Sequence, residues 1–150
     1  MSDHWIALIP EQPTFVPDSM AQQRARDRFA EIAPASEEIA IKLSDEIQFF
    51  DCGENFERVL CPSCNSEIPT GWWQDRMDED YESGFRLRSY AVPCCQTRHT
   101  LHELVYDWPQ GFGRFAIGAM NPNIGKLDDR FIREFEDMLG TRLRVIYQHI

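Results

Sequence analysis

Alternating apolar and polar residues predict a chain of short strands interrupted by helices. Residues 4–9, HWIALI, predict a buried strand, and the alternation in 39–43 and 47–50 predicts two more strands separated by a turn at 44–46. Residues 52–55, with Gly53, are typical of a hairpin turn. Four further strands are predicted at residues 56–60, 85–92, 114–120 and 143–147.

Apolar residues three or four positions apart predict three helices, at residues 18–33, 70–83 and 127–139. Asp18 or Ser19 would cap the first helix, and Gly84 and Gly140 would follow the ends of the other two. Residues 99–105 predict only a short helical turn.

The order strand, helix, strand occurs at the start of the chain, over residues 4–43, and again at its end, over 114–148. Two such units can form one sheet with both helices on one face. We therefore expect a single α+β domain over residues 1–150, with a ferredoxin-like sheet. The segment at about 52–104 would be an insertion that carries most of the cysteines.

Composition supports a folded protein that remains in the cytoplasm. Hydrophobic residues make up 43% of the chain, enough for a core, yet no apolar run approaches the roughly 20 residues of a membrane span. The first ten residues lack the basic and small-residue features of a secretory signal. Five cysteines, an odd number, in a reducing compartment argue against a disulfide framework.

The cysteines predict a zinc site. Residues 61–64 read CPSC, and residues 93–95 read PCC, each directly after a predicted strand. Thiolates are the ligands that tetrahedral zinc prefers, so we expect the set Cys61, Cys64, Cys94 and Cys95. Adjacent cysteines diverge in an extended chain, which leaves a second possibility. Three of these thiols could bind the metal together with His99 or His102.

Residues 56–104 resemble a zinc ribbon, in which two cysteine turns at strand ends share one ion. The second C-x-x-C of that family is replaced here by Cys94-Cys95. Residues 107–115, DWPQGFGRF, with Asn121-Pro122 and the closing residues 143–146, resemble small uncharacterised bacterial proteins that combine CPxC and PCC elements. This second resemblance implies a bacterial origin and no particular activity.

Four protein ligands leave zinc no open position for water or substrate, so this site predicts stabilisation rather than catalysis. The sequence HTLHE at 99–103 has the wrong spacing for a catalytic zinc motif. The other chemistries considered are a redox C-x-x-C pair and a cysteine nucleophile beside His99. Both compete with metal for the same thiols. We therefore expect no enzymatic activity.

The net charge of −10 opposes nucleic acid and suits a basic protein partner. The helix at 70–83 would present a row of carboxylates, and small acidic inhibitors of basic nuclease toxins dock in this way. The chain is therefore interpreted as a protein-interaction domain, in its most concrete form an immunity protein against a basic toxin. The alternatives are a solvated helix face and a zinc-ribbon protein that associates with nucleic acid. The carboxylates are those of Asp75, Asp78, Glu79, Asp80 and Glu82.

Overall fold

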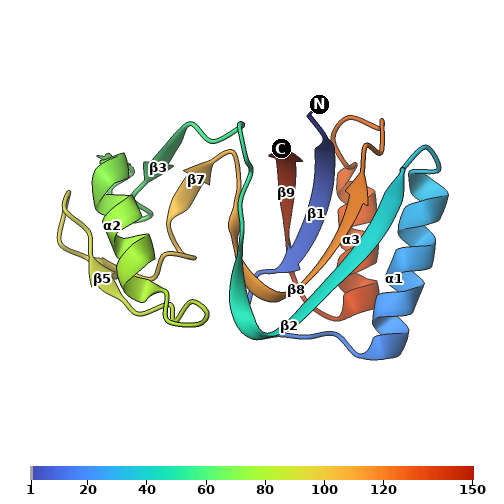
Figure 1. Cartoon of the computed structure of the whole chain (residues 1–150), viewed down its shortest axis with the longest axis horizontal. Helices are drawn as coiled ribbons and strands as arrows, with labels where there is room; N and C mark the ends of the chain where they lie inside the picture. The colour runs from blue at the N-terminus through green and yellow to red at the C-terminus, as the bar shows by residue number, and fades with distance from the viewer. Residues whose placement is uncertain (1) are drawn as a thin grey trace.

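The computed structural model describes residues 2–150 and confirms an α+β protein (Figure 1). Its main sheet has the strand order β2-β8-β1-β9, and every neighbouring pair is antiparallel. The sheet and the two helices that cover it are formed, in chain order, by β1 (His4–Pro10), α1 (Ser19–Ile32), β2 (Glu38–Phe50), β8 (Gly111–Met120), α3 (Asp129–Leu139) and β9 (Leu143–His149).

The helices α1 and α3 pack side by side on one face of the sheet (Figure 1). Phe29 and Phe135 meet between them, with ring centroids 5.2 Å apart. Both rings are fully buried against the apolar face of β1 and β8. No helix within residues 2–150 combines the length and the apolar character needed to cross a membrane.

The ends of these two helices follow from local chemistry. The carboxylate of Asp18 accepts the N–H of Ala21 at 2.8 Å, and Asp128 caps α3 in the same way. Gly140 ends α3 in the left-handed conformation, with φ of 75°. The helices predicted at 18–33 and 127–139 are confirmed to within two residues at each end.

The two strands predicted at 39–43 and 47–50 form one continuous strand, so the turn predicted between them is wrong. The register of β2 against β8 shifts between Leu43 and Gln48, which accommodates the extra residues as a bulge. Arg114 supports this bulge, because its Nε donates to the carbonyl of Ser44 at 3.0 Å. The polar stretch that indicated a turn therefore only bends the strand.

Residues 51–110 lie on the side of the sheet opposite α1 and α3 (Figure 1). They form a small three-stranded sheet of order β4-β3-β7, a two-stranded ribbon β5-β6 and one helix, α2. A second core fills this unit, with Val59, Ile68 and Leu101 buried in it. Its elements are β3 (Arg58–Leu60), β4 (Glu67–Ile68), α2 (Thr70–Asp80), β5 (Tyr90–Ala91), β6 (Arg98–His99) and β7 (Val105–Asp107).

The turn predicted at 52–55 is present, but it does not join a hairpin. It runs beside the end of β9, where the N–H of Glu54 donates to the carbonyl of His149 at 2.8 Å. Gly53 has φ of 63°, and a Cβ there would lie 2.2 Å from the His149 oxygen. The close approach of the two backbones therefore requires glycine.

Three predictions in the middle of the chain are wrong in extent. The strand predicted at 56–60 begins only at Arg58, and the strand predicted at 85–92 is reduced to Tyr90–Ala91. The helix predicted at 70–83 ends at Asp80, because Tyr81 is already extended. Gly84 is consequently not the residue after the helix. It lies in a loop against Glu46, with φ of 122°.

Candidate metal centre

The first cysteine turn is a tight knuckle that follows β3. The N–H of Cys61 donates to the carbonyl of Ser66, and the N–H of Asn65 donates back to the carbonyl of Cys61, both at 2.9 Å. Asn65 adopts a left-handed conformation with φ of 61°, which reverses the chain. The N–H of Ser63 donates to the Cys61 sulfur at 3.3 Å. We call residues 61–66 the first knuckle.

The second cysteine turn, residues 92–97, repeats the backbone of the first. The N–H of Val92 donates to the carbonyl of Thr97, and the N–H of Gln96 donates to the carbonyl of Val92, again both at 2.9 Å. Gln96 has φ of 63°. We call this segment the second knuckle, and it follows β5 as the first follows β3.

The equivalence of the two knuckles explains the adjacent cysteines. With the prolines superimposed, CPSC aligns with VPCC, so Val92 occupies the position of Cys61, and Cys94 that of Ser63. Val92 is fully buried in the core of this unit, as Cys61 is. The second knuckle thus keeps two thiols, with one of them moved by two positions. Aligning the two prolines would have revealed this relation in the sequence.

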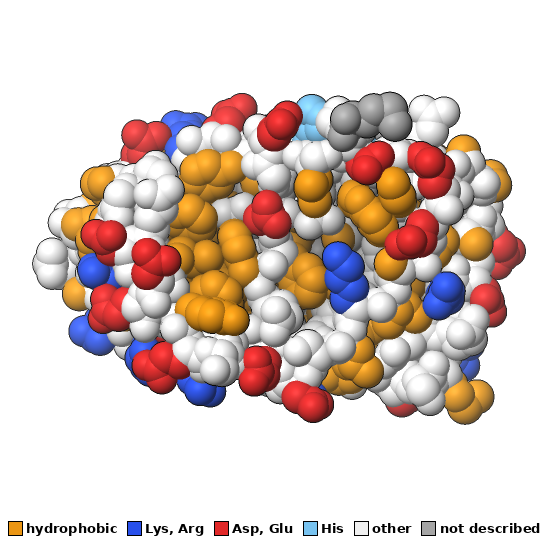
Figure 2. Space-filling view, viewed as in Figure 1, with side chains coloured by type: hydrophobic (Ala, Val, Ile, Leu, Met, Phe, Trp, Pro, Cys, Tyr) orange, Lys and Arg blue, Asp and Glu red, His pale blue; other side chains and the backbone are white. Residues whose placement is uncertain are grey.

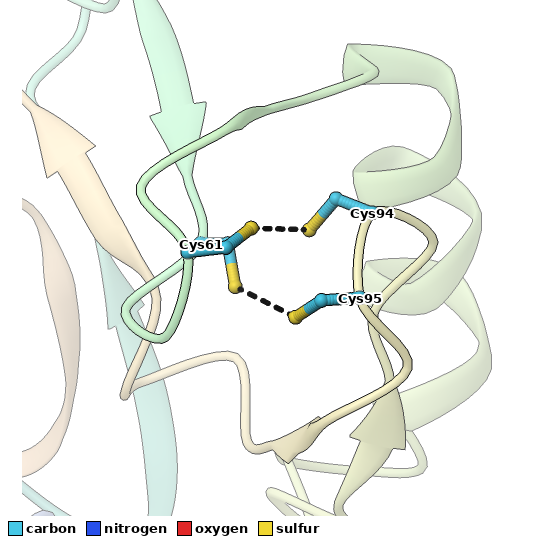
Figure 3. A group of neighbouring side chains, drawn as sticks. Cys61, Cys94 and Cys95 are labelled. Carbon is cyan, nitrogen blue, oxygen red and sulfur yellow. Dashed lines mark hydrogen bonds between the residues drawn. The ribbon is translucent and has the colours of Figure 1, made fainter.

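The two knuckles bring four thiols together. Figure 3 labels three of these cysteines, with Cys61 on the first knuckle facing Cys94 and Cys95 on the second. The sulfur of Cys61 lies 3.7 Å from that of Cys95, and the sulfur of Cys64 lies 3.4 Å from that of Cys94. All four sulfurs lie within 4.8 Å of one another. Zinc–sulfur bonds of about 2.3 Å in a tetrahedron separate the sulfurs by about 3.8 Å. The cluster therefore fits a metal ion bound by four thiolates.

Hydrogen bonds within the first knuckle lower the pKa of both of its thiols and so favour the thiolate form. Burial raises the pKa of Cys61, but the N–H groups of Cys64 and Ser63 outweigh this and hold the pKa below its usual value. Hydrogen bonds from the side chain and backbone of Ser66 lower the pKa of Cys64 to about 6. Poor hydration and the neighbouring thiols raise the pKa of Cys94 to about 12. A bound cation would have to displace the proton of Cys94, so metal binding depends on pH.

His99 lies beside the thiol cluster and outside it. Its Nε2 is 2.8 Å from the hydroxyl of Ser63 and 3.1 Å from the hydroxyl of Thr97. The Thr97 hydroxyl in turn contacts the sulfur of Cys95 at 3.1 Å. His99 therefore links the two knuckles through hydroxyl groups that surround the thiols.

His102 lies away from the cluster, with both ring nitrogens occupied. Its Nδ1 accepts the N–H of Phe112 at 3.0 Å, and its Nε2 lies 2.7 Å from the carbonyl of Glu11. Burial, followed by the charge of Arg144, lowers the pKa of His102 to about 4. This neutral imidazole joins the chain before α1 to the start of β8, and it is not available as a metal ligand.

Four of the five acidic residues predicted as a docking face lie on the surface, and Asp80 does not. Asp75, Asp78, Glu79 and Glu82 are exposed, although Glu79 pairs with Arg76 and Glu82 pairs with Arg88. Asp80 is fully buried, so its inclusion in the docking face is wrong. Its position seven residues after buried Trp73, two helical turns along the same face, was the signal in the sequence.

The fifth cysteine, Cys52, lies far from the knuckles in the core between the sheet and residues 51–110. It is fully buried, and its sulfur contacts Oε1 of Gln110 at 3.3 Å. Burial raises the pKa of Cys52 to about 11. Cys52 is therefore an unreactive core residue.

Comparison of the chain with protein-family models, curated proteins and solved structures found no significant match. What the protein does must therefore be inferred from the geometry of its own residues.

Proposed function

We propose that this protein is a non-enzymatic protein-interaction domain that contains a structural zinc ion. The observation that carries the proposal is the approach of four thiols to within 4.8 Å of one another. Four thiolate ligands complete a tetrahedral shell, and a complete shell leaves no position at which a substrate could bind the metal. Soft sulfur ligands in this geometry favour zinc over the hard cations.

Metal analysis of single variants tests this centre. We expect one zinc ion per chain, and its loss when Cys61, Cys64, Cys94 or Cys95 is replaced by serine. Cys52→Ser and His99→Ala are the matched controls, and both should keep the metal, because neither side chain belongs to the cluster. Zinc that survives Cys95→Ser but is lost in His99→Ala would instead indicate a histidine ligand.

We infer a single domain over residues 1–150, a ferredoxin-like sheet with a zinc-ribbon-like insertion at about 52–104. The order β2-β8-β1-β9, with α1 and α3 as the crossovers, supports the sheet assignment. The repeated knuckles support the insertion, as does the second core, to which the main sheet contributes Phe112 of β8 and Phe49 of β2.

The acidic surface of this protein suits a basic protein partner. The net charge is −10, and exposed carboxylates of α2 lie on the unit that carries the thiols. Opposite charge speeds encounter between two proteins and selects against acidic partners. The most concrete form of the proposal is a bacterial cytoplasmic immunity protein that binds a basic toxin.

Charge reversal tests the partner class. A basic protein from the source organism that binds the immobilised wild-type chain would be purified. Its association rate would then be measured with the wild-type chain and with the Asp75→Lys variant. We expect roughly tenfold slower association in the variant and a steep decrease with salt. Reversal of Asp137, an exposed residue of α3, is the control for net charge. Equal rates for both variants would contradict docking at α2.

A further inference from the structure

A set of aromatic and apolar side chains lies partly exposed between α2 and the end of β2. Figure 2 shows hydrophobic side chains gathered on the face in view, in the region between these two elements. We call this set the aromatic surface. It comprises Phe49, Phe56, Met77, Tyr81 and Phe85, of which Tyr81 is 54% exposed and the other four are half-buried.

The rings of the aromatic surface form a connected array that rests on buried residues. Tyr81 packs on Phe85 with ring centroids 5.2 Å apart, and the ring centroids of Phe85 and Phe49 are 6.2 Å apart. Phe56 stacks on Trp73, with ring centroids 5.2 Å apart. Aromatic side chains supported from below lose little conformational entropy on binding, and they are over-represented at the energetic centres of interfaces.

The backbone beneath this array is fixed on both sides. The N–H of Phe85 donates to the carbonyl of Ile47, which ties the loop after α2 to β2. The carboxylate of Asp80 accepts the N–H groups of Leu87 at 2.6 Å and Arg88 at 2.9 Å. The aromatic surface is therefore held in place before any partner arrives, which reduces the cost of association.

Acidic side chains lie on both sides of this apolar region (Figure 2). Asp78 is exposed on α2, and Glu46 is exposed on β2, where it packs against Gly84. Glu82, just after α2, is also exposed but already pairs with Arg88. An apolar centre with a charged rim is the usual composition of a protein interface. A second copy of this chain would bring two acidic rims together, so charge argues against self-association.

We propose that the aromatic surface binds an amphipathic segment of another protein. Two or three large apolar side chains of the segment contact Phe49, Tyr81 and Phe85, and its lysine or arginine residues pair with the carboxylates of the rim. This inference rests on the proposed function and names the partner chemistry and the contact surface. The proposed function relies on charge to attract the partner, whereas here apolar contact supplies most of the binding affinity.

Three synthetic peptides of about 18 residues, each with a helical period, separate these contributions. One combines leucine with lysine, a second combines leucine with glutamate, and a third combines serine with lysine. Each is titrated into the zinc-loaded protein, and binding is followed by chemical-shift changes of backbone amides. We expect the leucine–lysine peptide to bind at least about tenfold more tightly than either other peptide. The largest shifts should lie in residues 46–49 and 77–86.

Matched variants locate the contact. Tyr81→Ser removes the most exposed ring of the surface and should weaken binding of the leucine–lysine peptide by about tenfold. Met20→Ser, which changes an exposed apolar residue on α1, should leave binding within about twofold. Asp78→Lys should weaken binding more than Asp137→Lys, although the two variants have the same net charge.

Each other outcome overturns the inference. Equal binding of the serine–lysine peptide, unaffected by Tyr81→Ser, would mean that the carboxylates bind alone; the acidic docking face would then stand without the aromatic surface. Shifts centred on α1 or α3 would place the contact elsewhere. No binding of the leucine–lysine peptide up to about 1 mM would also reject the inference. These outcomes would leave the proposed function to be tested separately, by the association rates of the purified basic partner with the charge-reversal variants.

Discussion

Asp80 is the residue on which the irregular part of the second unit depends. Its buried carboxylate accepts the N–H groups of Leu87 and Arg88, and also the hydroxyl of Tyr90 at 2.9 Å. Removal would leave two partly buried N–H groups without this acceptor, and the loop without the side chain that holds it to α2. We expect Asp80→Ala to lower the free energy of unfolding by about 3 kcal/mol, measured by urea denaturation. Asp78→Ala, an exposed change on the same helix, should alter it by less than about 0.5 kcal/mol.

The contrast between the cysteines and Asp80 indicates what residue type can predict. The four thiols of the cluster were predictable, because a C-x-x-C and an adjacent cysteine pair, each at the end of a predicted strand, are typical of a metal site. A carboxylate in an acidic helix has an obvious solvent-exposed role, so residue type assigned Asp80 to the surface. Its hydrogen bonds go to a loop outside regular secondary structure, which no residue pattern in the sequence marks.

His102 makes stability depend on pH. Its pKa is about 4 in the folded protein, against about 6.5 when unfolded, so the unfolded chain binds more protons between these values. Stability from neutral His102 is therefore present above pH 6.5 and is lost as the pH falls towards 4. Between pH 7 and pH 5 the loss is about 2 kcal/mol.

His102→Asn provides the comparison, because an asparagine oxygen can replace Nδ1 as acceptor for Phe112 and does not titrate in this range. The variant is less stable at pH 7, but its stability should fall by about 2 kcal/mol less than that of the wild type between pH 7 and pH 5. Loss of a bound metal at low pH would affect both proteins and would cancel in the difference. Parallel pH profiles would show that His102 does not cause the dependence.

At the scale of elements, strong periodicity predicted well and short strands did not. The helix α3 and the strands β8 and β9 have long apolar patterns, with Gly140 as a clear signal for the end of the helix. Residues 85–92 alternate just as regularly, yet only Tyr90–Ala91 pair. Alternation of apolar and polar residues shows which side chains could share a face. A strand also needs a neighbouring backbone to accept and donate its hydrogen bonds. Here Leu87 is left-handed, with φ of 51°, and the carboxylate of Asp80 accepts the N–H groups of both Leu87 and Arg88, which in a strand would point to opposite sides.

The equivalence of the two knuckles predicts that the moved thiol can be moved back. Cys94→Ser alone should lose zinc, since it removes one of four ligands. The double variant Val92→Cys, Cys94→Ser converts VPCC into CPSC and places a thiol where the first knuckle has Cys61. We expect it to regain one zinc ion per chain, measured by metal analysis and by the cobalt absorption spectrum. Failure of the double variant to bind zinc would mean that matching backbones do not provide matching ligand positions.

At the scale of the whole molecule, two large cores lie on either side of a smaller one around Cys52. The sheet with α1 and α3 surrounds Phe29, Phe115 and Phe135, whereas the second unit has its own core around Val59 and Leu101. The strands of the second unit have only two or three residues, and short strands are weakly stable alone. The thiol cluster joins its two knuckles and would supply through zinc the stability that these strands lack.

Removal of zinc should therefore unfold the second unit first. After chelation, we expect amides of β3 and β7 to exchange with deuterium at least about 100-fold faster, while those of β1 and α3 change by less than about tenfold. The residual coupling should pass through Phe112, which belongs to β8 and packs against Phe49 and Phe85 of the second core. Cys52, buried between the two units, should stay unreactive towards iodoacetamide in both states if the main sheet persists. Equal acceleration in β1 and β3 would contradict this order, because the chain would then be a single cooperative unit.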